Sequence, residues 1–153
     1  MPITIDWQHG TVSEILRLAL AYFLALPVGW YREKEAHSIG VRTFPLVSMA
    51  SCGYLLLVAN GSAADQSRVI QGLVAGIGFI GGGAILKAEG NVHGTATAAS
   101  IWNTGVLGAA VAQQRYWLAA TLAFLNLFAL RVLLPLKQRL DALEAKRKRD
   151  EDL

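Results

Sequence analysis

Five apolar runs of similar length dominate this sequence and constrain its fold more than any other feature. Each holds 18 to 20 residues between charged or turn-forming residues, and the five are Val12–Tyr31, Thr43–Asn60, Val69–Leu86, Thr95–Ala112 and Tyr116–Leu134. A helix of that length spans about 27–30 Å, which matches the hydrocarbon core of a bilayer. Only helices and closed barrels satisfy the backbone in lipid, and these runs lack the alternation of barrel strands. We therefore expect an all-α polytopic membrane protein with about five transmembrane helices.

The composition supports a membrane class. Of the 153 residues, 54% are hydrophobic and 16% are charged, and the mean hydropathy is +0.40. Soluble domains carry about 25% charged residues, so this chain has too little polar surface for a water-soluble globule. Residues 1–11 contain no Lys or Arg, so we expect no cleavable signal peptide. The single cysteine, Cys52, excludes an internal disulfide and a cysteine-based metal cluster.

The lysines and arginines are unevenly distributed over the segments between the runs. With five spans, ten of the fourteen lie on the side of the C-terminus: Arg32, Lys34, Arg42, Lys87, Lys137, Arg139, Lys146, Arg147, Lys148 and Arg149. The other side holds Arg68 and Arg115, while Arg17 and Arg131 lie within spans. Cytoplasmic loops of membrane proteins are enriched in Lys and Arg, so we expect the N-terminus outside and the C-terminus in the cytoplasm.

The third run contains GIGFIGGGAIL (residues 76–86), which includes the string G-x-G-x-x-G. A dinucleotide site would need a preceding strand and an acidic residue about 20 positions further on. Here the string lies inside an apolar run, and no Asp or Glu occurs between Glu89 and Asp141. No Gly-Lys-Ser/Thr follows it either, which excludes a P-loop. We expect no nucleotide or other cofactor.

In lipid the same glycines serve helix packing. Gly72–Gly76 and Gly78–Gly82 are two G-x-x-x-G pairs, a spacing that lets helix backbones approach closely. In the fourth run, twelve of eighteen residues are Gly, Ala, Ser or Thr. We expect the third and fourth runs to form the closely packed centre, with the other three facing lipid more. The glycines could contact the fourth run or the third run of a second copy, and a break near Gly81–Gly83 is the alternative to simple packing.

Few polar residues in the runs invite a chemical role. Asn103 and Asn126 lie in mid-run, where an amide should face the bundle and hydrogen-bond across helices. The three histidines are scattered, and no Ser-His-Asp or Cys-His arrangement is present. We therefore expect no catalytic residue, no metal site and no enzyme.

The chain divides into a transmembrane domain of residues 1–135 and a cytoplasmic tail of residues 136–153. Leucines at helical spacing and the basic run Lys146–Arg149 make this tail amphipathic and basic. We expect it to be drawn to anionic lipid or to pair with a second copy.

Four motifs then carry a resemblance. In order along the chain they are WYRE (30–33), GVRT (40–43), GIGFIGGGAIL (76–86) and GTATAASIW (94–102). Their order and spacing resemble the MgtC/SapB family of bacterial inner-membrane proteins. Val41 and Phe44 stand where the family pattern has Leu and His, so a role of that His does not carry over. Longer members have a soluble C-terminal domain resembling the ACT fold, and we expect the short form without it.

The resemblance implies a small regulatory inner-membrane protein, linked to growth at low magnesium and survival in hosts, and to restraint of the F-type ATP synthase. We also expect contacts with the lipid bilayer, with a second copy (a dimer is favoured) or with another membrane complex, and none with nucleic acid. A magnesium or small-ion transporter is the alternative, although no run holds a central carboxylate. The residues singled out by motif or packing are Arg32, Glu33, Gly40, Arg42, Thr43, Asp65, Arg68, Gly76, Gly78, Phe79, Gly81, Gly83, Gly94, Thr97 and Trp102.

Overall fold

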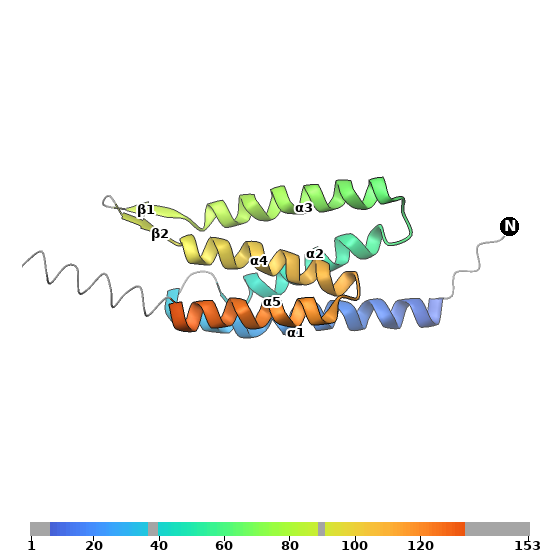
Figure 1. The fold of residues 1–153 in the computed structure, drawn as a ribbon, viewed down its shortest axis with the longest axis horizontal. Helices are drawn as coiled ribbons and strands as arrows, with labels where there is room; N and C mark the ends of the chain where they lie inside the picture. Colours follow the sequence, from blue (N-terminus) through green and yellow to red (C-terminus); the bar gives the residue numbers. More distant parts are fainter. Residues whose placement is uncertain (1–6, 37–39, 89–90, 134–153) are drawn as a thin grey trace, which may run out of the picture.

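The computed structural model, which describes residues 7–36, 40–88 and 91–133, contains five α-helices that run alongside one another (Figure 1). They are α1 (Trp7–Ala36), α2 (Thr43–Leu57), α3 (Ala63–Gly83), α4 (Thr95–Ala112) and α5 (Tyr116–Phe128), the last continued by the π-helical turn η1 (Ala129–Leu133). Each apolar run of the sequence corresponds to one helix, and α4 has the predicted bounds. The expectation of five helices is therefore confirmed.

The helices lie in three layers, with α3 on one side, α2 and α4 in the middle, and α1 and α5 on the other side (Figure 1). The central helix is α4, which contacts the other four. Half of its residues are buried: Thr97, Ser100, Ile101, Thr104, Gly105, Leu107, Gly108, Ala110 and Val111. Because so many of these side chains are small, the neighbouring backbones can approach α4 closely.

Two glycines of α4 mark the closest approaches. A Cβ added to Gly108 would overlap the backbone of Ser48 in α2, and one added to Gly105 would overlap the side chain of Ile77 in α3. The expectation that the third and fourth runs form the centre together is thus only half right. In α3 only Ile77 and Gly81 are buried, whereas α2 has six buried residues. The helix that packs most closely against α4 is α2.

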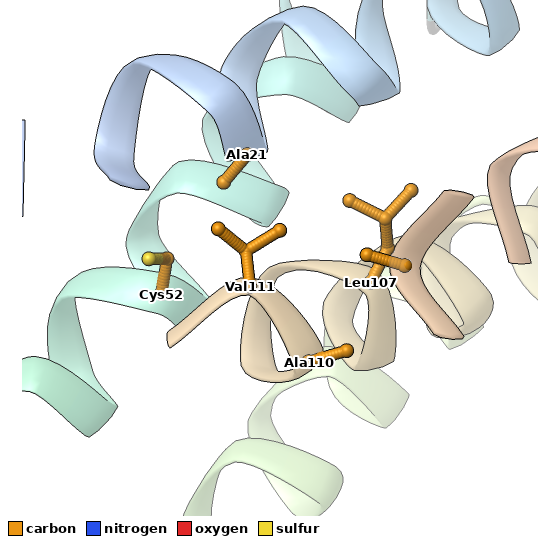
Figure 2. Packing of buried hydrophobic residues seen from close by; sticks show 6 residues of the cluster. Ala21, Cys52, Leu107, Ala110 and Val111 are labelled. Carbon is orange, nitrogen blue, oxygen red and sulfur yellow. The ribbon is translucent and has the colours of Figure 1, made fainter. Parts of the chain in front are cut away.

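Buried apolar side chains form two clusters at different levels of the bundle. One comprises Ala21 of α1, Cys52 of α2, Leu107, Ala110 and Val111 of α4, and Ala119 of α5. Figure 2 shows Ala21, Cys52 and Val111 converging from three helices. The other comprises Val28, Phe44, Ile77, Ala84, Ile101 and Leu130. The first cluster joins α1, α2, α4 and α5, and the second brings in α3 through Ile77.

The connection between α3 and α4 is more than a simple loop. It contains two short antiparallel strands, β1 (Leu86–Ala88) and β2 (Asn91–His93), with Lys87 opposite Val92. Both extend beyond the ends of α3 and α4 (Figure 1). The helix α3 runs without a break through Gly81 and ends at Gly83, where the N–H of Ala84 donates to the carbonyl of Gly81 at 3.0 Å. The glycines of 81–83 therefore end the helix rather than interrupt it.

Two of the described helices are long and apolar enough to cross a bilayer, over Gly10–Lys34 and Tyr116–Leu133. The helix α2 is apolar but shorter, and α3 and α4 are rich in glycine, hydroxyl and amide residues that lower their hydropathy. Five crossings and the orientation of the termini stay predictions. The tail of residues 136–153 lies outside the described residues.

Candidate functional site

The four sequence motifs meet at one end of the bundle. WYRE (30–33) lies near the end of α1, GVRT (40–43) leads into α2, Gly81–Gly83 end α3, and Gly94 and Thr97 begin α4. The chain thus brings two helix ends and two helix starts together, with the strands β1 and β2 beside them (Figure 1). We call this region the motif end.

The most buried charged group of the motif end is Arg32, which is 6% exposed. Its Nη2 donates a hydrogen bond to Oγ1 of Thr97, which is 4% exposed in the first turn of α4. A buried cation needs such partners because burial removes its hydration. This contact ties the last turns of α1 to the start of α4.

The neighbouring residue, Glu33, holds the start of α2. Its Oε2 accepts a hydrogen bond from the backbone N–H of Val41 at 3.1 Å. Gly40 lies so close to this side chain that an added Cβ would be 2.6 Å from the Cβ of Glu33. The carbonyl of Gly40 accepts from the N–H of Phe44 at 3.2 Å. Because any Cβ at position 40 would overlap Glu33, only glycine permits the close turn between α1 and α2.

The start of α4 also requires glycine, at position 94, for a different reason. The φ of +85° at Gly94 lies in the left-handed region, which other residues adopt at a cost. A Cβ there would also overlap the carbonyl oxygen of Ala84. The carbonyl of Gly94 accepts the first hydrogen bond of α4, from Ala98 at 2.9 Å. On the other side, an added Cβ at Gly81 would be 3.2 Å from the carbonyl oxygen of Ala98, so α3 also touches the start of α4.

Two cation–aromatic contacts lie at the motif end. The Nζ of Lys34 lies 5.4 Å from the centre of the Trp30 ring, and the guanidinium of Arg131 lies 5.7 Å from that of Tyr31. Arg42 is exposed at the start of α2, and the following Thr43 is half-buried. Such pairs of aromatic rings and cations suit the boundary between lipid and water.

Several residues singled out by the sequence lie elsewhere. Asp65 and Arg68 are in the first turns of α3, far along the bundle from Gly83 (Figure 1). Asp65 forms a capping box with Ser62, and the Ser62 hydroxyl, with its backbone N–H second, holds the pKa of Asp65 below its ordinary value. No Asp65–Arg68 ion pair is found in the described part of the chain.

The outward glycines form a third group. Gly76, Gly78 and Gly83 are exposed, with no atom within 4 Å of an added Cβ, and Phe79 is 84% exposed. Trp102 is half-exposed on α4. Of the two partners that the sequence left open for Gly76 and Gly78, the fourth run of the same chain is therefore excluded within the described residues.

Polar contacts link α4 to its neighbours further along the bundle. The Ser100 hydroxyl donates to Oδ1 of Asn126 at 2.9 Å, and Nδ2 of Asn103 donates to the carbonyl of Leu122 at 3.3 Å. The prediction that both asparagines bond across helices is confirmed. Between α2 and α1, the Ser48 hydroxyl donates to the carbonyl of Ala21 at 2.8 Å. The sequence reasoning missed Ser48 and Ser100, although Thr97, Ser100 and Thr104 recur at helical spacing, a signal of one buried face.

The arrangement offers little for metal or covalent chemistry. Among the residues that the structure describes, no group of three His, Cys, Asp or Glu could hold a metal ion. Glu14 and Asp65 are exposed, and the Glu33 carboxylate accepts a hydrogen bond from the backbone N–H of Val41. The motif end can therefore fasten helix ends together, and the side chains present there suit structural hydrogen bonding.

These features define a helical bundle of membrane-protein type whose sequence motifs fasten the helix ends. The chain matches the MgtC family over residues 18–139, and it belongs to that family. No solved structure matches it significantly.

Three curated relatives illustrate the match. "Putative magnesium transporter YhiD" of Escherichia coli (strain K12) is 32% identical over 139 residues, which cover 85% of this chain and 65% of the relative. Protein SrpB of Synechococcus elongatus is 37% identical over 62% of this chain and 60% of its own length. Protein MgtC of Salmonella typhimurium (strain LT2) is 33% identical over 72% of this chain and 49% of its own length. The chain thus spans about half to two thirds of these relatives.

Proposed function

We propose that this chain is a non-enzymatic regulatory protein of the bacterial inner membrane that acts in adaptation to low magnesium. In this proposal it crosses the membrane five times, with the N-terminus outside and the C-terminus in the cytoplasm. It acts through helix contacts with itself or with a membrane complex such as the F-type ATP synthase. Membership of the MgtC family and the ten-to-two distribution of basic residues support this placement.

The observation that carries the proposal is how the buried polar groups are used. Arg32 bonds to Thr97, Ser100 to Asn126, and Ser48 to a backbone carbonyl of α1. These bonds join helices to one another. Magnesium binds carboxylates and waters in nearly octahedral geometry, and none of the carboxylates that the structure places is buried in the bundle. A bundle of this kind is suited to presenting helix surfaces to a partner.

Growth at limiting magnesium tests the proposal. Cells that lack the gene should grow poorly when magnesium is scarce, and the wild-type chain should restore growth without raising the rate of magnesium uptake. Crosslinking in native membranes, followed by purification and identification of co-purifying proteins, should recover a second copy or a membrane complex. Restored growth that always accompanies a proportional rise in uptake would contradict the proposal.

Transport is the second candidate, and two observations favour it. The name of the E. coli relative associates that protein with magnesium transport, and Thr97, Ser100 and Thr104 place a row of buried hydroxyls along α4. Purified protein in liposomes separates the two candidates, because a carrier moves magnesium unaided whereas a regulator needs its partner.

A further inference from the structure

The helix α3 lies at the edge of the bundle and presents an open side. It is separated from α1 and α5 by the layer of α2 and α4 (Figure 1). Its buried residues, Ile77 and Gly81, face α4. A different side carries Gly72, Gly76, Phe79 and Gly83, all exposed, which we call the α3 seam. At the three glycines of this seam, an added Cβ would meet no atom within 4 Å.

An apolar groove borders the seam. It lies between α2 and α3 and has a volume of about 610 Å³. Gly72, Gly76 and Ile80 line it from α3, and Leu46, Ala50 and Tyr54 line it from α2. Because two of the lining residues are glycines, the groove reaches to the α3 backbone. A bulky apolar side chain from another molecule can therefore be seated there.

The seam itself supplies such a side chain. Phe79 is 84% exposed and follows Gly76 by three residues, so it projects from the same helix that forms the hollow. A patch that carries both a projecting group and a hollow is self-complementary, which is what a twofold interface requires. Two parallel copies of α3 would place each Phe79 at the level of the other copy's groove.

Charge adds an independent match at the start of the helix. Asp65, Gly72 and Phe79 recur at intervals of seven residues, so they follow one side of α3. Arg68 lies one turn from Asp65, and the described residues contain no ion pair between the two. In a parallel twofold pair, residues of equal number share a level, so Arg68 of each copy lies about one turn from Asp65 of the other, within reach of its long side chain. Two complementary charge pairs then lie at the end of the interface nearest the start of α3.

Lipid alone does not account for this surface. Glycine destabilises a helix relative to alanine, and lipid tails pack against any side chain. A backbone that approaches another backbone gains contacts only glycine permits. We propose that the α3 seam and the adjoining groove bind a second copy of this chain, as a parallel twofold dimer. The inference rests on the membrane placement of α3 given under Proposed function.

Disulfide trapping in native membranes tests the interface. In a Cys52→Ala background, Gly76→Cys should form a crosslinked dimer when copper–phenanthroline oxidises the two thiols. The control is Gly78→Cys, which lies about 200° round the helix from position 76 and is also exposed. Crosslinking at 78 with none at 76, or equal crosslinking at both, would overturn the proposed seam.

Truncation of the projecting side chain gives a second readout. Phe79→Ala should raise the dissociation constant of the detergent-solubilised dimer about tenfold or more, as removal of an interface aromatic does. Trp117→Ala is the matched control, because Trp117 is 89% exposed on α5. Arg68→Glu should also weaken the dimer, and Arg115→Glu should not. Equal effects of Phe79→Ala and Trp117→Ala on dimer size would overturn the proposal.

The outcomes separate this inference from the proposed function. A trapped seam dimer that carries magnesium by itself would refute the regulatory function and leave the interface standing. A strictly monomeric protein that restores growth at low magnesium without transport would refute the interface and leave the regulatory function standing.

Discussion

At the residue scale, the chain depends on a few close contacts of charged and glycine residues. Arg32 is an example, because the sequence marks it as part of a motif but does not reveal that it is buried. An arginine next to Glu33 and Lys34 near the end of an apolar run is expected at the membrane surface. The structure instead directs it to Thr97, 65 residues further along the chain. Sequence spacing cannot predict a contact of that range.

Thr97→Val tests this contact. Valine has nearly the shape of threonine but cannot accept the hydrogen bond from Arg32, so the variant should lose about 1.5–3 kcal/mol of stability. Thermal unfolding in detergent measures the loss. Thr121→Val is the control, since the exposed Thr121 hydroxyl bonds to the carbonyl of Trp117 in its own helix. Equal stability of the two variants would show that the Arg32–Thr97 contact contributes nothing.

At the element scale, the glycines of α3 and α4 divide into two functions. Those of α4, Gly105 and Gly108, permit close packing inside the chain, while Gly72, Gly76 and Gly78 of α3 face outward. The sequence predicted tight packing from the G-x-x-x-G pairs of α3 and overlooked the shorter spacing in α4. A glycine pattern identifies a helix that can be approached closely, but it does not identify the neighbour.

Gly108→Leu should disrupt the protomer itself. The new side chain would overlap the backbone of Ser48, and backbone cannot move aside cheaply, so we expect a loss of about 1–3 kcal/mol or more. Protein abundance in membranes and thermal unfolding in detergent report it. Ala120→Leu on the exposed side of α5 is the control and should be nearly neutral. Gly76→Leu should leave the protomer's stability intact, because space is open there; if it unfolds the monomer, the position of α3 is wrong.

At the scale of the whole molecule, much of the architecture follows from hydropathy alone. The apolar runs predicted five helices, and the starts of α2 and α5 fall at Thr43 and Tyr116 as expected. The hairpin of β1 and β2 was missed because its strands are only three residues long, too short for an alternating pattern. The layer order was also beyond the sequence, since it depends on which small side chains meet.

The orientation in the membrane is the next prediction at this scale. A reporter fused after Leu153 should be active only in its cytoplasmic form, and one inserted at Gly61 only in its external form. The reason is the ten-to-two distribution of basic residues. Gly61 lies in the exposed turn between α2 and α3, so the insertion should spare the helices. The reverse result at either site would exclude five spans in this orientation.

Magnesium flux into liposomes tests the central claim, that this bundle acts through helix contacts and does not carry the ion. The purified full chain is reconstituted, uptake of Mg²⁺ is followed with an internal fluorescent indicator, and vesicles with an ionophore serve as the positive control. We predict uptake equal to that of empty vesicles, because the described interior offers hydrogen-bonded hydroxyls and amides but no buried carboxylate. Saturable uptake above empty vesicles that Glu33→Ala or Asp65→Ala abolishes would contradict the account and identify the chain as a transporter.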